Sequence, residues 1–182
     1  MKLYISDLHF GHANAINFDH RPFASTDEMD QVLIKLWNDR VQPDDTVYIL
    51  GDFCYRNEKP AEWYLQKLRG HKILIQGNHD GPLLENPKAM HYFEGVEKMM
   101  HVQDGNTHIC LCHFPIAEWN GFYHGTWHIY GHIHAHVDAT AEFMRTREHA
   151  LNAGCMINNY TPASFRELVE NNERFNKELG KK

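Results

Sequence analysis

The stretch Ile73-Leu74-Ile75-Gln76-Gly77-Asn78-His79-Asp80 guides the interpretation of the whole chain. Its apolar run is typical of a buried strand, and the run stops at a glycine. Because glycine lets the backbone turn sharply, Asn78 and His79 are expected to project beyond the end of the strand. Taken alone, these residues are equally typical of a Gly-Asn turn followed by a surface histidine.

The same pattern, a short apolar run that ends in a metal-binding type of residue, occurs at four other places. These are Tyr4-Ile5-Ser6 before Asp7-Leu8-His9, Val47-Tyr48-Ile49-Leu50 before Gly51-Asp52, Ile109-Cys110-Leu111-Cys112 before His113, and His128-Ile129-Tyr130 before Gly131-His132-Ile133-His134. Five occurrences in one chain argue against coincidence. They predict a site assembled at the ends of several strands.

Length and charge narrow the class of protein. The chain has 182 residues, which is typical of one domain with a core of its own, and no linker or repeat divides it. A formal net charge of -6 argues against binding to duplex nucleic acid, which normally needs a clustered basic face. The 15 histidines are the compositional outlier and favour a site built on imidazole ligands.

The cysteines and the N-terminus bear on the compartment. None of the four cysteines forms a C-x-x-C pair, and Cys110 and Cys112 point to one face of a predicted strand as small core residues. A reducing environment follows. The N-terminus starts with a strand and has no signal-like segment, and no apolar run is long enough to span a bilayer. We therefore expect a cytoplasmic protein with no membrane partner.

The first half of the chain predicts alternating strands and helices. Strands are expected at residues 2–6, 46–50 and 71–76. A helix begins at Ser25, which has capping-box spacing to Glu28, and a second runs from Pro60 to Arg69. This order indicates a parallel α/β core.

The second half is richer in predicted strands. Residues 96–103 and 107–112 form an expected hairpin around Asp104-Gly105-Asn106, after a short helical or irregular insert at 82–90. A strand at 128–130 and two weaker strands near 136–143 and 149–157 would complete a second sheet. The chain is expected to end in a helix at about 161–175, with a frayed tail to residue 182.

The polar residues at the strand ends form a set of potential ligands for metal ions. The set is Asp7, His9, Asp52, Asn78, His113, His132 and His134. Seven ligands exceed the need of one tetrahedral zinc, and no cysteine joins them as in closed structural zinc sites. They suit two metals that share a bridging carboxylate, about 3.5–4 Å apart, as in enzymes of in-line displacement at phosphorus.

These motifs, in this order, resemble those of the calcineurin-like metallophosphoesterases. The matching elements are Asp7-x-His9, Gly51-Asp52, Gly77-Asn78-His79-Asp80, His113 and Gly131-His132-x-His134, which span residues 7 to 134. The resemblance implies a four-layer α/β/β/α sandwich with a dinuclear metal site at the strand ends. It also implies that residues 1–182 form a single metallophosphoesterase domain.

The resemblance further implies a role for each matching residue. Asp7, His9 and His134 would hold the first metal, Asn78, His113 and His132 the second, and Asp52 would bridge them. A hydroxide bridging the metals would attack phosphorus, with His79 acting as a cation or general acid at the leaving oxygen. Manganese is the favoured metal, and iron, zinc, nickel and cobalt also suit mixed oxygen and nitrogen ligands.

One motif departs from the protein-phosphatase branch of that family. Tyr55 stands where that branch has an aspartate that orients the histidine, so Asp80 is the nearest substitute candidate for this catalytic support. Arg56 keeps the arginine position and is a candidate phosphate contact, as is His12. Arg21, Tyr123 and His124 are weaker candidates on loops.

The leading hypothesis is a phosphodiesterase. Its substrate would be a small phosphoester, and nucleotides belong to this class. The chain has little length for a cap, so an open site is expected. A phosphomonoesterase acting on a small phosphorylated metabolite is the alternative within the same chemistry. A non-catalytic binding scaffold is the alternative from another class, but such scaffolds lack a histidine that is present here as His79. A structural metalloprotein would lose its fold without metal. Nothing in the sequence selects an oligomeric state.

Overall fold

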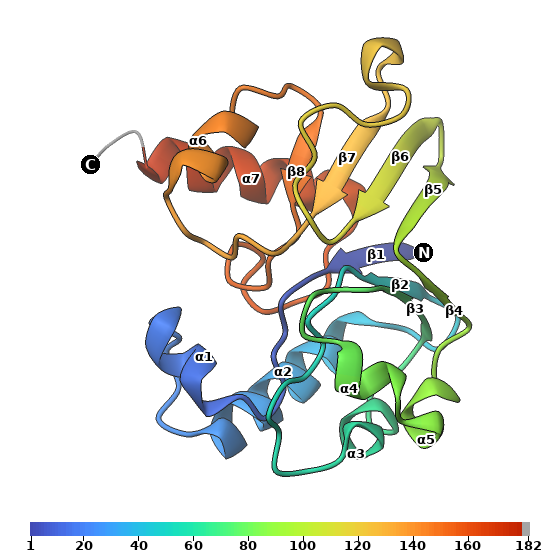
Figure 1. Cartoon of the computed structure of the whole chain (residues 1–182), viewed down its shortest axis with the longest axis vertical. Helices are drawn as coiled ribbons and strands as arrows, with labels where there is room; N and C mark the ends of the chain where they lie inside the picture. The colour runs from blue at the N-terminus through green and yellow to red at the C-terminus, as the bar shows by residue number, and fades with distance from the viewer. Residues whose placement is uncertain (180–182) are drawn as a thin grey trace.

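The computed structural model describes residues 1–179 and contains two four-stranded sheets, which lie one above the other in Figure 1. The first sheet consists of β1 (Lys2–Ile5), β2 (Thr46–Ile49), β3 (His71–Ile75) and β4 (Gly95–Glu97), in that spatial order. All its strands are parallel. The carboxyl ends of β1, β2 and β3 therefore lie at one edge, as the alternation of strands and helices predicted.

The second sheet consists of β5 (Met99–Asp104), β6 (Thr107–Cys112), β7 (Trp127–Tyr130) and β8 (Ala150–Asn152). Strands β5 and β6 form the expected antiparallel hairpin, whereas β6, β7 and β8 are parallel. The backbone turns in this hairpin at Gly105, whose φ is +57°. A left-handed residue suits such a turn.

Helices cover the first sheet on the side away from the second (Figure 1). They are α2 (Thr26–Arg40), α3 (Ala61–Leu65), α4 (Gly81–Leu84) and α5 (Pro87–Met90), whereas α1 (Ala13–Phe18) lies beyond the carboxyl end of β1. Ser25 caps α2 as predicted, because its hydroxyl accepts from the Glu28 N–H at 3.2 Å. Leu3 and Ile5 of β1 pack in one buried cluster with Trp37 of α2.

The intervening residue of β1, Tyr4, belongs to a separate apolar core that packs between the two sheets. This apolar core contains Tyr48, Leu50 and Ile75 from the first sheet or its loops, and Ile109, Leu111, Ile129 and Leu151 from the second sheet. Helices α6 (Ala139–Met144) and α7 (Phe165–Leu179) lie beside β8 (Figure 1). The expected four-layer α/β/β/α sandwich is thereby confirmed.

Several predicted elements were wrong in extent or type, and the strand expected near 149–157 is only the three residues of β8. The strand expected at 96–103 breaks at Lys98, so that its two parts, β4 and β5, belong to different sheets. The strand expected at 136–143 is instead helix α6, because the Asp138 side chain accepts from the Ala141 N–H and caps a helical turn. The helix that begins after Pro60 ends at Leu65 rather than Arg69.

The last helix also differs from the expectation of residues 161–175. It begins at Phe165 and stays helical to Leu179, where polar composition predicted fraying. Asn172 explains part of this length, because it accepts from the Asn152 N–H at 2.9 Å and donates to the Asn152 carbonyl at 3.0 Å. The predicted frayed tail at 180–182 lies outside the described residues. Within residues 1–179, no helix is long and apolar enough to cross a membrane.

Candidate metal centre

The loops that follow the strands are joined to one another by main-chain hydrogen bonds. The Asp7 N–H donates to the Gly51 carbonyl at 3.1 Å, and the His9 N–H donates to the Asp52 carbonyl at 2.9 Å. On the second sheet, the Gly131 N–H donates to the His113 carbonyl at 2.9 Å. These bonds bring the sequence motifs together, although more than 120 residues separate the first from the last.

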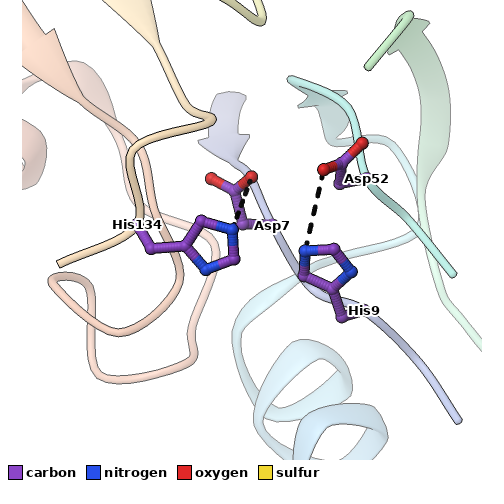
Figure 2. A group of neighbouring side chains, drawn as sticks. All are labelled: Asp7, His9, Asp52 and His134. Carbon is purple, nitrogen blue, oxygen red and sulfur yellow. Dashed lines mark ion pairs between the residues drawn. The ribbon is translucent and has the colours of Figure 1, made fainter. Parts of the chain in front are cut away.

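Four of the predicted ligands form what we call the first cluster: Asp7, His9, Asp52 and His134 (Figure 2). One potential ligand atom from each lies within 4.8 Å of the others. His9 Nε2 is 3.7 Å from Asp52 Oδ2, and His134 Nε2 is 3.8 Å from Asp7 Oδ1. All four residues are buried, and none is more than 7 % exposed.

His9 gives a test of whether this cluster suits a cation. Both of its ring nitrogens are buried, and neither has a hydrogen-bond partner within residues 1–179. Burial lowers the pKa of His9 far below its ordinary value, as do the charges of nearby His134 and Arg21. The ring is thus neutral and presents a free lone pair beside a carboxylate. A divalent cation satisfies both groups, so the residues fit a metal ion.

The other three predicted ligands form the second cluster: Asn78, His113 and His132. Asn78 Oδ1 lies 2.9 Å from both His113 Nε2 and His132 Nδ1. The Nδ1–H of His113 donates to the Leu50 carbonyl at 2.7 Å, which leaves a lone pair on Nε2. A lone pair that faces an amide oxygen at this distance needs a proton or a cation between them, and this is a second fit to metal.

Asp52 lies between the two clusters. Its Oδ2 is 3.7 Å from His9 Nε2 and 3.7 Å from His113 Nε2, so one carboxylate oxygen faces a ligand of each cluster. Its Oδ1 accepts from the His79 N–H at 2.9 Å. Burial raises the pKa of Asp52 to about 6, against the opposing effect of His113. Burial of this carboxylate is compatible with a position beside cations.

The backbone at the ligands is unusual. Five of the seven ligand residues have positive φ although none is glycine: Asp7 (57°), His9 (51°), Asp52 (54°), His132 (71°) and His134 (51°). Each such conformation costs free energy, about 1–3 kcal/mol at strained sites, and persists only when the surrounding structure imposes it. The concentration of strain at the predicted ligands marks this edge as functional.

Two motif glycines permit the close approach of these loops. A Cβ atom at Gly77 would lie 2.4 Å from Asp52 Oδ1 and 2.6 Å from its main-chain nitrogen. A Cβ atom at Gly131 would lie 1.8 Å from Ser6 Oγ and 2.8 Å from Asp7 Oδ2. The glycines of these motifs therefore leave space for the two ligand carboxylates.

Asp80 does not have the predicted position beside the His79 ring. Its Oδ2 accepts from the Asp52 and Gly77 N–H groups at 2.9 and 2.8 Å, and its Oδ1 accepts from the Phe53 N–H at 3.0 Å. No hydrogen bond joins it to the His79 ring in residues 1–179. The fully buried carboxylate instead holds the loops after β2 and β3 together, so the predicted catalytic role of Asp80 is replaced by a structural one.

Tyr55 supports the His79 ring instead. The two ring centroids are 4.3 Å apart, and the His79 ring lies 5.7 Å from that of His9. His12 packs nearby, 5.2 Å from the Tyr55 ring, and its Nδ1 is buried without a partner. Burial, followed by the charge of His79, lowers the pKa of His12. Arg56 is exposed and lies over the Tyr55 ring at 5.2 Å, so the two predicted substrate contacts, His12 and Arg56, both lie against Tyr55.

Sequence reasoning missed Asp19 and misjudged Arg21. Asp19 Oδ2 accepts from His134 Nδ1 at 2.9 Å and from Arg21 Nη2 at 2.9 Å. Arg21 is buried and also donates to the carbonyls of Asp7 and Leu8, each at 2.8 Å. Arg21 therefore stabilises the first cluster by holding the main chain at Asp7 and the side chain of Asp19. The only sequence signal was the Asp-x-Arg spacing, in a loop without period.

Comparison with known proteins agrees with this geometry. A family model described as calcineurin-like phosphoesterase matches residues 3–106. The uncharacterized protein MJ1445 of Methanocaldococcus jannaschii is 33% identical over 172 residues, which cover 93% of this chain and 90% of that protein. The gene 66 protein of Mycobacterium phage L5 is 36% identical over 131 residues, 62% of each chain. Among solved structures, the protein of unknown function AQ665 from Aquifex aeolicus is 28% identical, with a TM-score of 0.73 over 93% of this chain and 98% of that one.

Proposed function

This chain belongs to the calcineurin-like phosphoesterase family, and from that premise we propose that it hydrolyses phosphodiesters with two divalent cations. One observation carries the proposal. Asp52 Oδ2 lies at the same distance, 3.7 Å, from a histidine of each cluster, as a carboxylate shared by two cations requires. The family itself is metal-dependent.

The two clusters divide the ligands between the cations. Asp7, His9 and His134 would hold one, Asn78, His113 and His132 the other, and Asp52 both. When bound, the cations would polarise the phosphoryl oxygens and lower the pKa of the attacking water. Manganese is our choice, since mixed carboxylate, amide and imidazole ligands suit it, and the same set also accepts iron, zinc, nickel or cobalt.

The remaining residues act on the substrate. His79 is half-buried beside the first cluster, where its ring donates a proton to the leaving oxygen. His12 packs against the Tyr55 ring beside this site and is our candidate contact for a phosphoryl oxygen, and exposed Arg56 offers its guanidinium. Asn78 is itself exposed, so the second cluster reaches the surface. Such an open site accepts an ester group on either side of phosphorus, which favours diesters over monoesters.

Paired assays test this function. Protein stripped of metal and reloaded with Mn²⁺ is expected to hydrolyse bis-p-nitrophenyl phosphate faster than p-nitrophenyl phosphate. Asp52→Asn and His79→Ala remove this activity, whereas the matched controls Asp44→Asn and His108→Ala, both at exposed positions, retain it. Circular dichroism of the stripped protein is expected to remain native-like, because the strands carry their own apolar core.

Each other outcome of these assays selects a different function. Faster turnover of the monoester would identify a phosphomonoesterase of small metabolites. Absence of turnover with every metal would favour the binding scaffold. Loss of the folded signal on stripping would indicate a structural metalloprotein.

A further inference from the structure

A cavity of about 470 Å³ opens beside the second cluster. Its walls come from Asn78 in the loop after β3, Lys98 and Met99 at the junction of β4 and β5, and Cys112 and Phe114 at the end of β6. Its volume falls in the range of small-molecule sites, roughly 300–1,000 Å³. Because Asn78 belongs to both the cavity and the second cluster, a substrate at the clusters can extend directly into this space.

Phe114 is the main aromatic group of this cavity. Its ring packs edge-on against His113 and His132, with centroids 5.0 and 4.8 Å away. It nevertheless remains 44% exposed, and Met99 remains 45% exposed. The exposed Phe114 ring and Met99 thioether beside a polar site favour a planar aromatic ligand. An aromatic ligand can stack on the phenyl ring and contact the sulfur atom favourably.

The charge of the cavity refines the choice of ligand. Lys98 is exposed at its rim, and no carboxylate side chain lines it within residues 1–179. Gln76 adds an amide to the same wall. A planar ring with several hydrogen-bond acceptors matches this combination of apolar walls and polar donors, whereas a plain hydrocarbon ring leaves the donors unused.

The cavity and the His79 ring adjoin different clusters. His79 packs against Tyr55 and His9 beside the first cluster, whereas Phe114 packs against His113 and His132 of the second. If His79 serves the leaving oxygen, the cavity receives the ester group that stays on phosphorus. We infer that this cavity is a subsite for the nucleobase of a nucleotide diester, with Phe114 as the specificity residue. The inference rests on the proposed hydrolase function.

The test uses two diesters with the same leaving group, the p-nitrophenyl ester of thymidine 5′-phosphate and p-nitrophenyl methyl phosphate. Wild-type protein loaded with Mn²⁺ is expected to prefer the thymidine ester by about 10-fold in kcat/KM, in line with base stacking on aromatic side chains. Phe114→Ala and Met99→Ala each lower this preference toward about 1-fold. The kcat/KM for the methyl ester, measured in parallel for each variant, separates loss of base binding from a general loss of activity.

The matched control is Phe143→Ala, since Phe143 is a 40% exposed phenylalanine on α6 that lines neither cluster nor cavity. A second readout, saturation-transfer NMR of thymidine with stripped protein, reports the cavity without any chemistry. The expected signal is present in wild type and Phe143→Ala and lost in Phe114→Ala.

The outcomes separate the two proposals. Hydrolysis of both esters without preference, or a preference that Phe114→Ala leaves intact, overturns the nucleobase subsite and leaves the hydrolase in place. No hydrolysis, together with a thymidine signal that depends on Phe114, overturns the hydrolase and keeps the subsite. No hydrolysis and no thymidine signal overturn both.

Discussion

The two ligand clusters differ in their burial and in what holds their side chains. The first cluster is buried, and Asp19 and Arg21 brace it from behind. In the second cluster only His113 is fully buried, while Asn78 is exposed and its amide contacts the two histidines. The side chains of the first cluster are therefore held in place, whereas those of the second would have to exchange their mutual contacts for a cation under the proposed function.

This difference suggests a division of labour. Under the proposed function, a rigid cluster would hold its cation with little reorganisation during the reaction. An exposed cluster with an adjoining cavity would constrain the position of a substrate less. Asp52 lies between the two clusters, so its substitution tests most directly whether they act together.

Asp52→Asn is expected to have the largest effect. Loss of the shared carboxylate leaves each cluster one ligand short, so Mn²⁺ binding falls from two equivalents to at most one. Turnover should fall by roughly 10³-fold, because two-metal clamping contributes several kcal/mol and each 1.36 kcal/mol is tenfold. Inductively coupled plasma analysis and diester kinetics measure both quantities, with Asp44→Asn as control. Two tightly bound equivalents with normal turnover would exclude a bridging role.

Asp19→Asn is expected to weaken the first cluster alone. Asp19 orients His134 through its Nδ1–H, and loss of such a partner typically lowers metal affinity by about 10–100-fold. Competition of the protein with a fluorescent chelator for Mn²⁺ reports each binding step. The tighter step should weaken, and the other should stay within about 2-fold of wild type, since Asp19 contacts no residue of the second cluster in residues 1–179.

His134→Ala provides the matching background for this prediction. If Asp19 acts through His134, adding Asp19→Asn to His134→Ala changes the tighter binding step no further. Equal and additive losses in both backgrounds would show a general electrostatic role instead. Thermal unfolding of each variant separates these outcomes from loss of the fold, because Arg21 loses a charged partner in both backgrounds.

Metal titration of the wild-type protein measures the difference in affinity between the two clusters. Stripped protein should bind Mn²⁺ in two steps that differ by about 10-fold, which corresponds to 1.4 kcal/mol. The buried first cluster is expected to fill first, because its ligands need no rearrangement. His9→Ala removes the tighter step and His132→Ala the weaker one. Isothermal titration calorimetry that shows His132→Ala removing the tighter step would reverse the assigned order.

The sequence brought out the seven candidate ligands because they follow apolar runs, a signal that depends only on local order. Asp19 had no such signal, since its role depends on a contact with His134, 115 positions further along the chain. The position of Asp80 was equally hidden, because its partners are main-chain N–H groups, which every residue carries. The break at Lys98 depends on which sheet each half can join, and local propensity cannot supply that.

Tyr55 gives the smallest predicted effect and isolates the substrate side of the first cluster. Its ring supports His79 where the phosphatase branch uses an aspartate, and an aromatic contact is worth about 0.5–1.5 kcal/mol. Tyr55→Ala should therefore lower kcat by roughly 3–10-fold and leave both Mn²⁺ steps unchanged, whereas Tyr55→Phe keeps the contact and most of the rate. In a His79→Ala background, Tyr55→Ala should change kcat no further, because the group it positions is gone. A further loss in that background would mean that Tyr55 contacts the substrate itself, and the support of His79 would have to come from another residue.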